Sequence, residues 1–100
     1  MNVKLGDYIW LLGHSKDDSK EPKKASATVY HGRFVAKDED RICVDEFNSL
    51  NGSILRFYSV EGLGTEFFLS QQEAELKQEE VKNMYREQGY TVKDWPNPKY

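Results

Sequence analysis

The residues best suited to metal binding or nucleophilic catalysis are two histidines, His14 and His31, and a single cysteine, Cys43. A zinc site needs several converging ligands, usually at spacings such as CxxC or HxxxH, and this sequence has neither. A nucleophilic pair of Cys43 and His31 would have to face each other on neighbouring strands, and no third residue is evident that would orient the histidine. We therefore expect no metal, no cofactor and no catalytic residue.

Acidic side chains are concentrated in residues 37–47, which hold five acids and two bases. Asp38, Glu39 and Asp40 lack the glycine and the spaced terminal glutamate of a calcium loop. Such a run commonly solvates a hairpin turn, and it can also attract a basic protein surface or mimic a nucleic-acid backbone. On the second interpretation, these three residues are candidates for binding a partner.

Arginine and aromatic residues form another candidate group. Arg33, Arg56 and Tyr58 lie in aromatic stretches, where guanidinium groups and rings could hold a nucleotide-like molecule. Trp95 lies in a proline-containing tail, where a hydrophobic core least explains a tryptophan. The net charge of −3 disfavours nucleic acid, because nonspecific binding needs a concentrated basic face. A protein or a small molecule is therefore the favoured ligand.

The candidate residues must be positioned by the secondary structure around them. Five apolar segments predict strands, at residues 5–12, 28–36, 42–47, 53–60 and 66–69. Gly32, inside the second segment, predicts a bulge or a bend. Residues 14–27 have almost no apolar side chains, so ordering them would bury little, and we expect a long mobile loop there. The density of strands predicts an α+β fold with a small five-stranded antiparallel barrel or bent sheet.

One C-terminal helix is predicted by its start and stop signals. Residues 70–73 (SQQE) match the capping box, in which Ser70 and Glu73 satisfy backbone amides at a helix start. Gly89 suits the left-handed residue that ends a helix. The face predicted to pack on the sheet contains Ala74, Lys77, Val81, Met84, Tyr85 and Gln88. Leu76 falls on the opposite face, and Pro96 and Pro98 predict an irregular tail at residues 96–100.

One hundred residues, 38% of them hydrophobic, predict a single folded domain over residues 1–100. The longest apolar run, residues 8–12, is far shorter than the about 20 residues that span a bilayer. The first residues lack the apolar region of a secretion signal, and a lone cysteine cannot form an internal disulfide. We therefore expect a cytoplasmic protein without membrane contact. Its predicted core consists of Trp10, Tyr30, Phe34, Ile42, Val44, Leu55, Phe57, Phe67 and Leu69.

Two segments resemble known families. Residues 32–47 (GRFVAKDEDRICVDEF) resemble the bent hairpin of SH3-like small barrels. Residues 66–75 (EFFLSQQEAE) resemble the "FLTxEEAE" junction of many short uncharacterised proteins of bacteriophages and Firmicutes, with Ser in place of Thr and Gln-Gln in place of acidic residues. That resemblance implies a small barrel that runs into a C-terminal helix, in accessory or host-interaction proteins, some of which inhibit host defence. It carries over no functional residue, because the shared segment is structural.

The leading hypothesis is a nonenzymatic, phage-type accessory protein. It would bind and inhibit a host protein, such as a defence factor, through exposed aromatics and the acidic hairpin, in the host cytoplasm. The alternative is an oligomer that sequesters a nucleotide-like small molecule between Arg33, Arg56 and neighbouring rings. A third hypothesis is an enzyme that uses Cys43 or a pair of carboxylates. A homo-oligomer is compatible with each.

Overall fold

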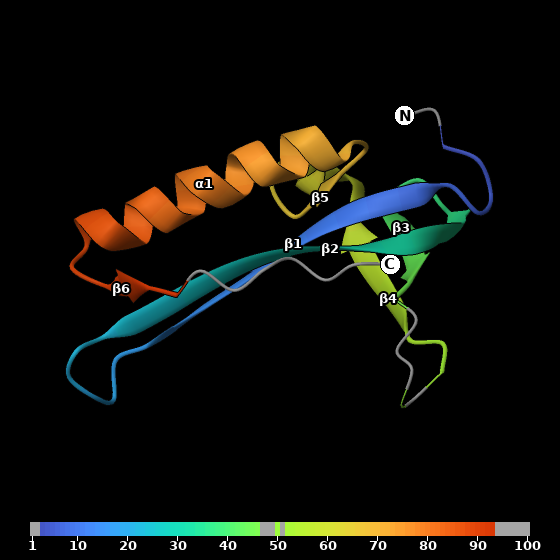
Figure 1. The fold of residues 1–100 in the computed structure, drawn as a ribbon. Coiled ribbons are helices and arrows are strands. Elements are labelled where there is room, and N and C mark those ends of the chain that lie inside the picture. The colour runs from blue at the N-terminus through green and yellow to red at the C-terminus, as the bar shows by residue number, and fades with distance from the viewer. Residues whose placement is uncertain (1–2, 47–49, 51, 94–100) are drawn as a thin grey trace.

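The computed structural model describes residues 3–46, 50 and 52–93, which form an antiparallel sheet with one helix across part of it (Figure 1). Five strands follow one another across the sheet in the order β4-β3-β2-β1-β5. Their bounds are β1 Tyr8–Asp17, β2 Lys24–Lys37, β3 Arg41–Asp45, β4 Leu55–Ser59 and β5 Phe67–Phe68. The α-helix α1 spans Gln71–Glu87, a short 3-10 turn η1 spans Val60–Gly62, and β6 (Thr91–Val92) pairs in parallel with the start of β2. The chain is an α+β fold.

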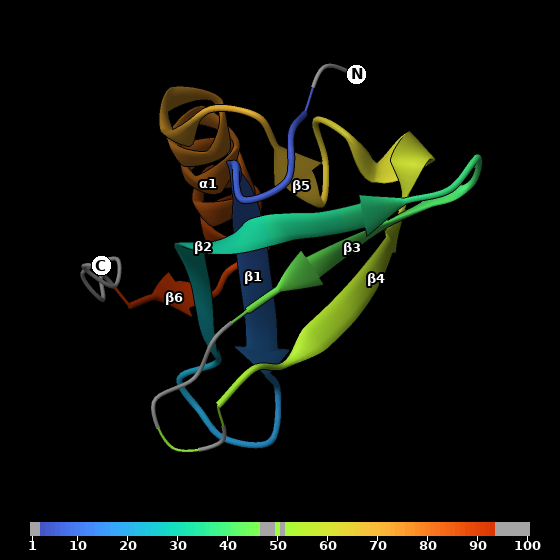
Figure 2. The same cartoon turned by 90° about the vertical axis from the view of Figure 1, so that its right-hand side faces the viewer.

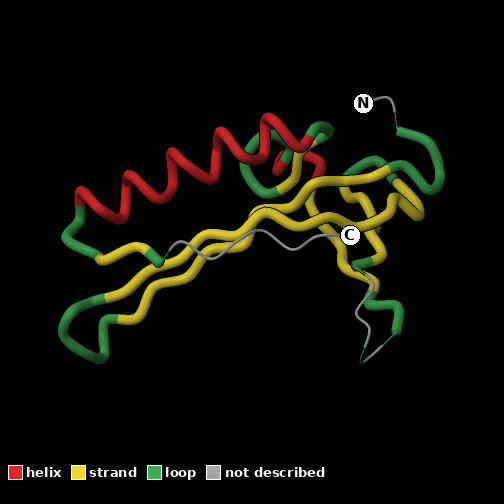
Figure 3. The backbone as a smooth tube through the Cα atoms, viewed as in Figure 1, coloured by secondary structure: helices red, strands yellow, loops and turns green. Residues whose placement is uncertain are grey.

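The longest feature of the sheet is the hairpin of β1 and β2. Its register runs without interruption from Tyr8 opposite Arg33 to Asp17 opposite Lys24. The predicted mobile loop over residues 14–27 is therefore wrong at both ends, since only residues 18–23 connect the strands. The reason is tertiary: Ala25 and Ala27 are buried against Tyr85 and other residues from the helix region. Figure 3 shows both strands continuing beneath the whole length of the helix.

The two sides of the sheet bury different clusters. We call the side on which α1 packs the helix side and the opposite side the core side. On the core side the main cluster consists of Ile9, Leu11, Phe34, Ile42, Val44 and Phe67. On the helix side, α1 covers Leu12, Ala25, Ala27, Val29 and Phe68. Successive residues of a strand point to opposite sides of the sheet. In β5, Phe67 therefore packs in the core-side cluster and Phe68 packs under the helix.

The sheet bends so that β3 and β4 turn over the core side, as the crossing of β1 and β3 in Figure 2 shows. Gly32 permits this approach: a Cβ there would lie 2.5 Å from Val44 Cγ1 and 2.7 Å from the Asp45 carbonyl oxygen. The strand irregularity lies slightly further on, between Phe34 and Ala36. At Gly32 itself the structure shows a close contact with β3, and the predicted bulge lies after it, between Phe34 and Ala36.

The sheet is not closed into a barrel, so of the two predicted alternatives the bent sheet is the one observed. The border strands β4 and β5 do not pair with each other in the part of the chain that the structure describes. Because β4 is a border strand, Leu55 and Phe57 are 55% and 60% exposed, and their predicted place in the core is wrong. Leu69 is also exposed, and Trp10 and Tyr30 are half-buried. The remaining predicted core residues, Phe34, Ile42, Val44 and Phe67, are confirmed.

The helix begins and ends as predicted. Ser70 Oγ accepts a hydrogen bond from the Glu73 amide at 3.2 Å, and Gly89 has a φ of +92°. Ala74, Val81 and Tyr85 are buried, whereas Leu76 is 65% exposed, as the pattern predicted. The buried face also includes Gln78 and Lys82, in place of the predicted Met84 and Gln88, which are exposed. Gln78 Nε2 reaches the sheet and donates to the Ala27 carbonyl oxygen at 2.9 Å. No helix among the described residues is long and apolar enough to cross a membrane.

Candidate functional site

The helix covers only part of the helix side. On the same side of the sheet, β1 carries Tyr8 and Trp10, and β2 carries His31 and Arg33. Trp10 lies at the border of the covered part, where it packs against the cluster of Val29, Phe68 and Ala74. In the strand register Tyr8 lies opposite Arg33 and Trp10 opposite His31, so the four side chains form two adjacent cross-strand pairs. We call these four residues the aromatic–arginine cluster.

The cluster is held together by direct contacts. The Arg33 guanidinium carbon lies 4.3 Å from the centroid of the Tyr8 ring, and Arg33 Nη2 donates to the Tyr8 hydroxyl at 3.0 Å. Arg33 Nη1 donates to the Gly6 carbonyl oxygen at 3.1 Å. The His31 ring lies between the two aromatic rings, 4.6 Å from Tyr8 and 5.0 Å from Trp10 between centroids, edge-on to both. These contacts order the side chains before any ligand arrives, which reduces the entropy lost on binding.

Electrostatics favour the neutral form of the histidine. Burial lowers the pKa of His31 below its usual 6.5, and the positive charge of Arg33 lowers it further. A neutral imidazole keeps one ring nitrogen as a hydrogen-bond acceptor. At neutral pH, the fixed positive charge of the cluster is therefore that of Arg33.

An open cleft of about 470 Å³ borders the cluster. It is lined by Val3, Gly6, Asp7, Tyr8, Trp10 and Leu69. The lining combines apolar surface and ring faces with one carboxylate, Asp7, whose Oδ2 accepts a hydrogen bond from the Lys4 amide at 2.9 Å. The cleft is an open depression suited to an inserted side chain or a flat small molecule.

The same side of the sheet continues across β3 and β4. Arg33 lies opposite Asp45, Asp45 opposite Leu55, and Cys43 opposite Phe57. The Arg41 guanidinium lies 5.2 Å from the centroid of the exposed Phe57 ring. We call the whole uncovered region the exposed half-sheet; it consists of Tyr8, Trp10, His31, Arg33, Asp45, Leu55 and Phe57.

The predicted acidic residues form the turn between β2 and β3. Asp38 Oδ1 accepts hydrogen bonds from the amides of Asp40 at 2.8 Å and Arg41 at 2.7 Å. These two backbone hydrogen bonds hold the pKa of the Asp38 carboxyl below its usual value. Asp38 therefore shapes the turn, while the exposed Glu39 and Asp40 are directed by it into solvent. The turn begins five residues after Arg33 on β2, about 16 Å along the strand.

Arg56 and Tyr58 come together on the core side, around a residue that sequence reasoning missed. Glu46 is only 8% exposed. Its Oε1 accepts a hydrogen bond from the Tyr58 hydroxyl at 3.0 Å, and its Oε2 lies 2.6 Å from Arg56 Nε. The 2.6 Å distance makes this a close ion pair between an exposed guanidinium and a buried carboxylate. The pKa values of Tyr58 and Tyr30 are both raised, mainly by burial and further by the nearby Glu46 carboxylate.

Arg33 and Arg56 are not brought together within one chain. Arg33 is opposite Asp45, whereas Arg56 is opposite Val44, and successive residues of β3 point to opposite sides of the sheet. The predicted binding group therefore divides into two: Arg33 with the acidic turn, and Arg56 with Tyr58 on the other side. Trp95 and the predicted tail at residues 96–100 lie outside the described residues. The alternation of Ile42 and Val44 with Glu46 was the signal that could have placed this glutamate on the core side.

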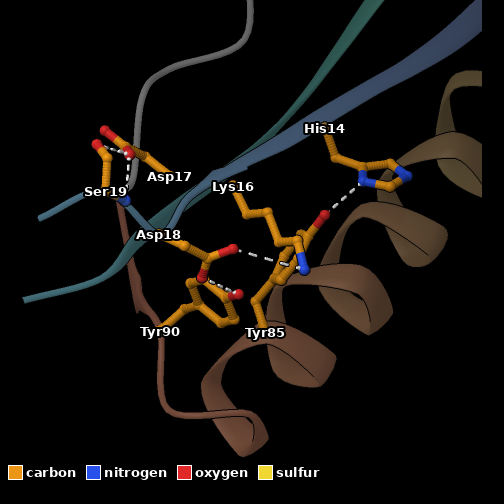
Figure 4. A network of polar contacts seen from close by, with 7 residues as sticks. All are labelled: His14, Lys16, Asp17, Asp18, Ser19, Tyr85 and Tyr90. Carbon is orange, nitrogen blue, oxygen red and sulfur yellow. Dashed lines mark hydrogen bonds and ion pairs between the residues drawn. The ribbon is translucent and has the colours of Figure 1, made fainter.

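A separate polar network fastens the end of the hairpin to the end of the helix (Figure 4). His14 Nδ1 and the Tyr85 hydroxyl lie 2.7 Å apart, and the Tyr90 hydroxyl donates to Asp18. Lys16 forms an ion pair with Asp18 at 3.7 Å and lies over the Tyr90 ring. These contacts explain why the end of the β1–β2 hairpin is ordered, although the sequence predicts a loop there. They also give His14 a structural role, in contact with Tyr85.

The predicted candidates for nucleophilic catalysis and metal binding are not brought together among the described residues. Cys43 lies opposite Ala36 and His31 opposite Trp10, so the hypothetical nucleophile pair is not formed. Within residues 3–46, 50 and 52–93, no group of three or more histidine, cysteine or acidic side chains could hold a metal ion. What the exposed half-sheet can do chemically is bind, through rings, apolar side chains and a preordered arginine.

Comparison with protein-family models, with curated proteins and with solved structures found no match. The resemblances drawn from the sequence, to small phage proteins and to SH3-like barrels, therefore stay predictions. The functional argument depends on the site alone.

Proposed function

We propose that this chain is a nonenzymatic binding protein that engages another protein through its exposed half-sheet. Following the sequence resemblance, it is a phage-type accessory protein, and its partner is a host protein whose activity it inhibits. The observation that carries the proposal is the placement of α1, which covers one half of the helix side and leaves Tyr8, Leu55 and Phe57 exposed on the other half. In the strand register, Arg33 and Asp45 lie between Tyr8 and Leu55, so exposed apolar side chains alternate with charged ones on this surface. Aromatic residues and arginine are enriched at protein interfaces.

Charge favours a basic partner. The exposed half-sheet, the cleft that borders it and the β2–β3 turn together contain the acids Asp7, Asp38, Glu39, Asp40 and Asp45. Basic side chains are fewer than acidic ones in this region. One of them, Arg33, already donates hydrogen bonds to the Tyr8 hydroxyl and the Gly6 carbonyl oxygen. Acidic groups at the rim of an apolar patch speed encounter with a basic surface and reject acidic ones. The expected partner surface therefore has an apolar or aromatic anchor surrounded by lysine and arginine.

The test compares three immobilised baits in lysate of a bacterial host. Tyr8→Ser removes the ring on which Arg33 stacks, at a position that is exposed and tolerant of substitution. Leu76→Ser is the matched control, because Leu76 is an exposed apolar residue on the outer face of α1. A protein that binds the wild type and Leu76→Ser, and binds Tyr8→Ser at least tenfold less, supports the proposal. Equal recovery by all three baits, or recovery by none, contradicts it.

A small nucleotide-like ligand is the second candidate function. The observation in its favour is the cleft of about 470 Å³, where the Tyr8 and Trp10 rings stand next to Arg33. A ligand that binds only the folded state raises the melting temperature, by an amount that grows with the logarithm of its concentration once this exceeds the Kd. A panel of nucleotides should therefore stabilise the wild type and not Tyr8→Ser. If no nucleotide shifts the melting temperature, this alternative is wrong.

A further inference from the structure

Strand β4 is an open border of the sheet. It follows β3 at one end of the strand order, and Figure 2 shows no described element beyond it. The Glu46 amide donates to the Ile54 carbonyl, and the Val60 amide donates to the Asp40 carbonyl. Backbone groups alternate in direction along an antiparallel strand. The amides and carbonyls of Leu55, Phe57 and Ser59 therefore point away from β3, toward the open border.

This border lacks the usual protection. Natural edge strands are commonly blocked by lysine, proline or a bulge, which prevent pairing with another chain. The five residues of β4, LRFYS, include no lysine and no proline, and their pairing with β3 is regular. Their one charged side chain, Arg56, is engaged by Glu46 on the core side. Leu55 and Phe57 are large apolar side chains that remain exposed on the helix side.

We propose that β4 pairs with β4 of a second copy of this chain, antiparallel, about a twofold axis at Phe57. This register places Phe57 opposite Phe57 of the second copy and Leu55 opposite Ser59. On the core side it places Arg56 opposite Tyr58, where a guanidinium can lie against a ring. The pairing ends with these five residues, because β4 stops at Ser59 and the 3-10 turn η1 begins at Val60.

Charge and polarity select this register over its neighbours. Moving the axis to Arg56 places two guanidinium groups directly opposite each other, and like charges in that position are destabilising. Moving the axis to Tyr58 would require Glu61 of the second copy opposite Leu55, but Glu61 belongs to the 3-10 turn η1, so Leu55 would have no strand residue to pair with. With the axis at Phe57, apolar residues meet apolar or small residues, and each Arg56 keeps its own Glu46 as a counterion.

The pairing would join two sheets into one continuous sheet. It brings Leu55 and Phe57 of the exposed half-sheet into the dimer interface. It leaves the aromatic–arginine cluster of each copy free, since Tyr8 and Trp10 lie on β1, which the two strands β2 and β3 separate from β4. Two clusters on one dimer would bind a repeated or oligomeric partner with increased avidity. The dimer does not depend on the proposed function, and variants of Tyr8 leave it unchanged.

Sedimentation velocity of the full chain over a wide concentration range gives the first test. The wild type should pass from the monomer mass of 11.7 kDa to twice that mass as its concentration rises. Phe57→Lys sets two lysines opposite each other at the axis and should weaken association at least tenfold, whereas the matched Leu76→Lys should not. Circular dichroism verifies that both exposed positions tolerate the change. A monomer at every concentration, or equal association of the two variants, overturns the proposal.

Disulfide trapping tests the register itself. The variants are made with Cys43→Ala, because Cys43 lies directly opposite position 57 within the same chain. Residues facing each other in a hydrogen-bonded antiparallel pair have Cα atoms about 5.5 Å apart, within reach of a disulfide. Phe57→Cys should therefore oxidise to a covalent dimer. Leu55→Cys should not do so alone but should when mixed with Ser59→Cys. Crosslinking of Leu55→Cys alone at the same rate as Phe57→Cys overturns the assigned axis.

Discussion

Substitution of Gly32 tests the close contact on which the bent sheet depends. A Cβ at this position would lie 2.5 Å from Val44 Cγ1 and 2.7 Å from the Asp45 carbonyl oxygen. Val44 is fully buried and β-branched, and the oxygen belongs to the backbone of β3, so neither can move aside easily. Overpacking of this kind typically costs about 1–3 kcal/mol, and two such contacts place Gly32→Ala at the upper end.

The net effect is smaller, because alanine loses less backbone entropy on folding than glycine, by about 0.5–1 kcal/mol. We therefore expect Gly32→Ala to lower the free energy of unfolding by about 2 kcal/mol. In a domain of this size, this corresponds to a fall in melting temperature of about 8–16 °C.

Gly13 supplies the matched control. It lies in β1 of the same sheet, and a Cβ there would meet only Tyr30 Cε1 at 3.4 Å. Gly13→Ala should therefore be neutral or stabilising by up to about 1 kcal/mol. Thermal and urea unfolding followed by circular dichroism, at one protein concentration, measures both variants. Equal effects of the two substitutions would refute the argument that β3 closes over Gly32.

Three further predictions follow from local contacts. Ser70→Ala removes the acceptor of the Glu73 amide and should destabilise the protein by about 1 kcal/mol in urea unfolding, with Ser70→Asp restoring most of it. Tyr85→Phe removes the hydroxyl that lies 2.7 Å from His14 Nδ1 and should cost about 0.5–1.5 kcal/mol, while Met84→Leu, at an exposed position, should not. The pKa of His31 is lowered in the folded state, so the unfolded chain binds a proton more readily, and stability should fall as the pH drops below about 6.5. His31→Phe should show a smaller loss over that interval by thermal unfolding, and an equal loss would contradict the assignment.

The helix illustrates what local sequence can predict. Its start and its end depend on Ser70, Glu73 and Gly89, and each of these acts on backbone groups within a few residues of itself. Such interactions need no distant partner, so the predicted boundaries match the observed Gln71–Glu87. The strands were located for a related reason, because alternating apolar residues are favoured in a pleated strand wherever it lies in the sheet.

The candidate site was only partly predictable. Arg33 and the acidic turn are on the exposed half-sheet, but Tyr8, Trp10 and His31 were not expected to join them. Their assembly depends on the pairing of β1 with β2, which aligns residues far apart in the chain. Alternation with Ile42 and Val44 could have placed Glu46 on the core side, but its partners Tyr58 and Arg56 come from β4 and are known only from the strand pairing.

By itself, the sequence determined the local elements: strands from alternation, and a helix from its caps and apolar stripe. Tertiary structure decided which elements are central and which are borders. Residues 14–17 and 24–27 became strands because the distant Tyr85 and Tyr90 provide the burial that the segment lacks. Leu55 and Phe57 became surface because β4 has a neighbour on one side only, and Arg33 and Arg56 were separated by strand register. Burial and register are properties of paired segments, and no single segment contains them.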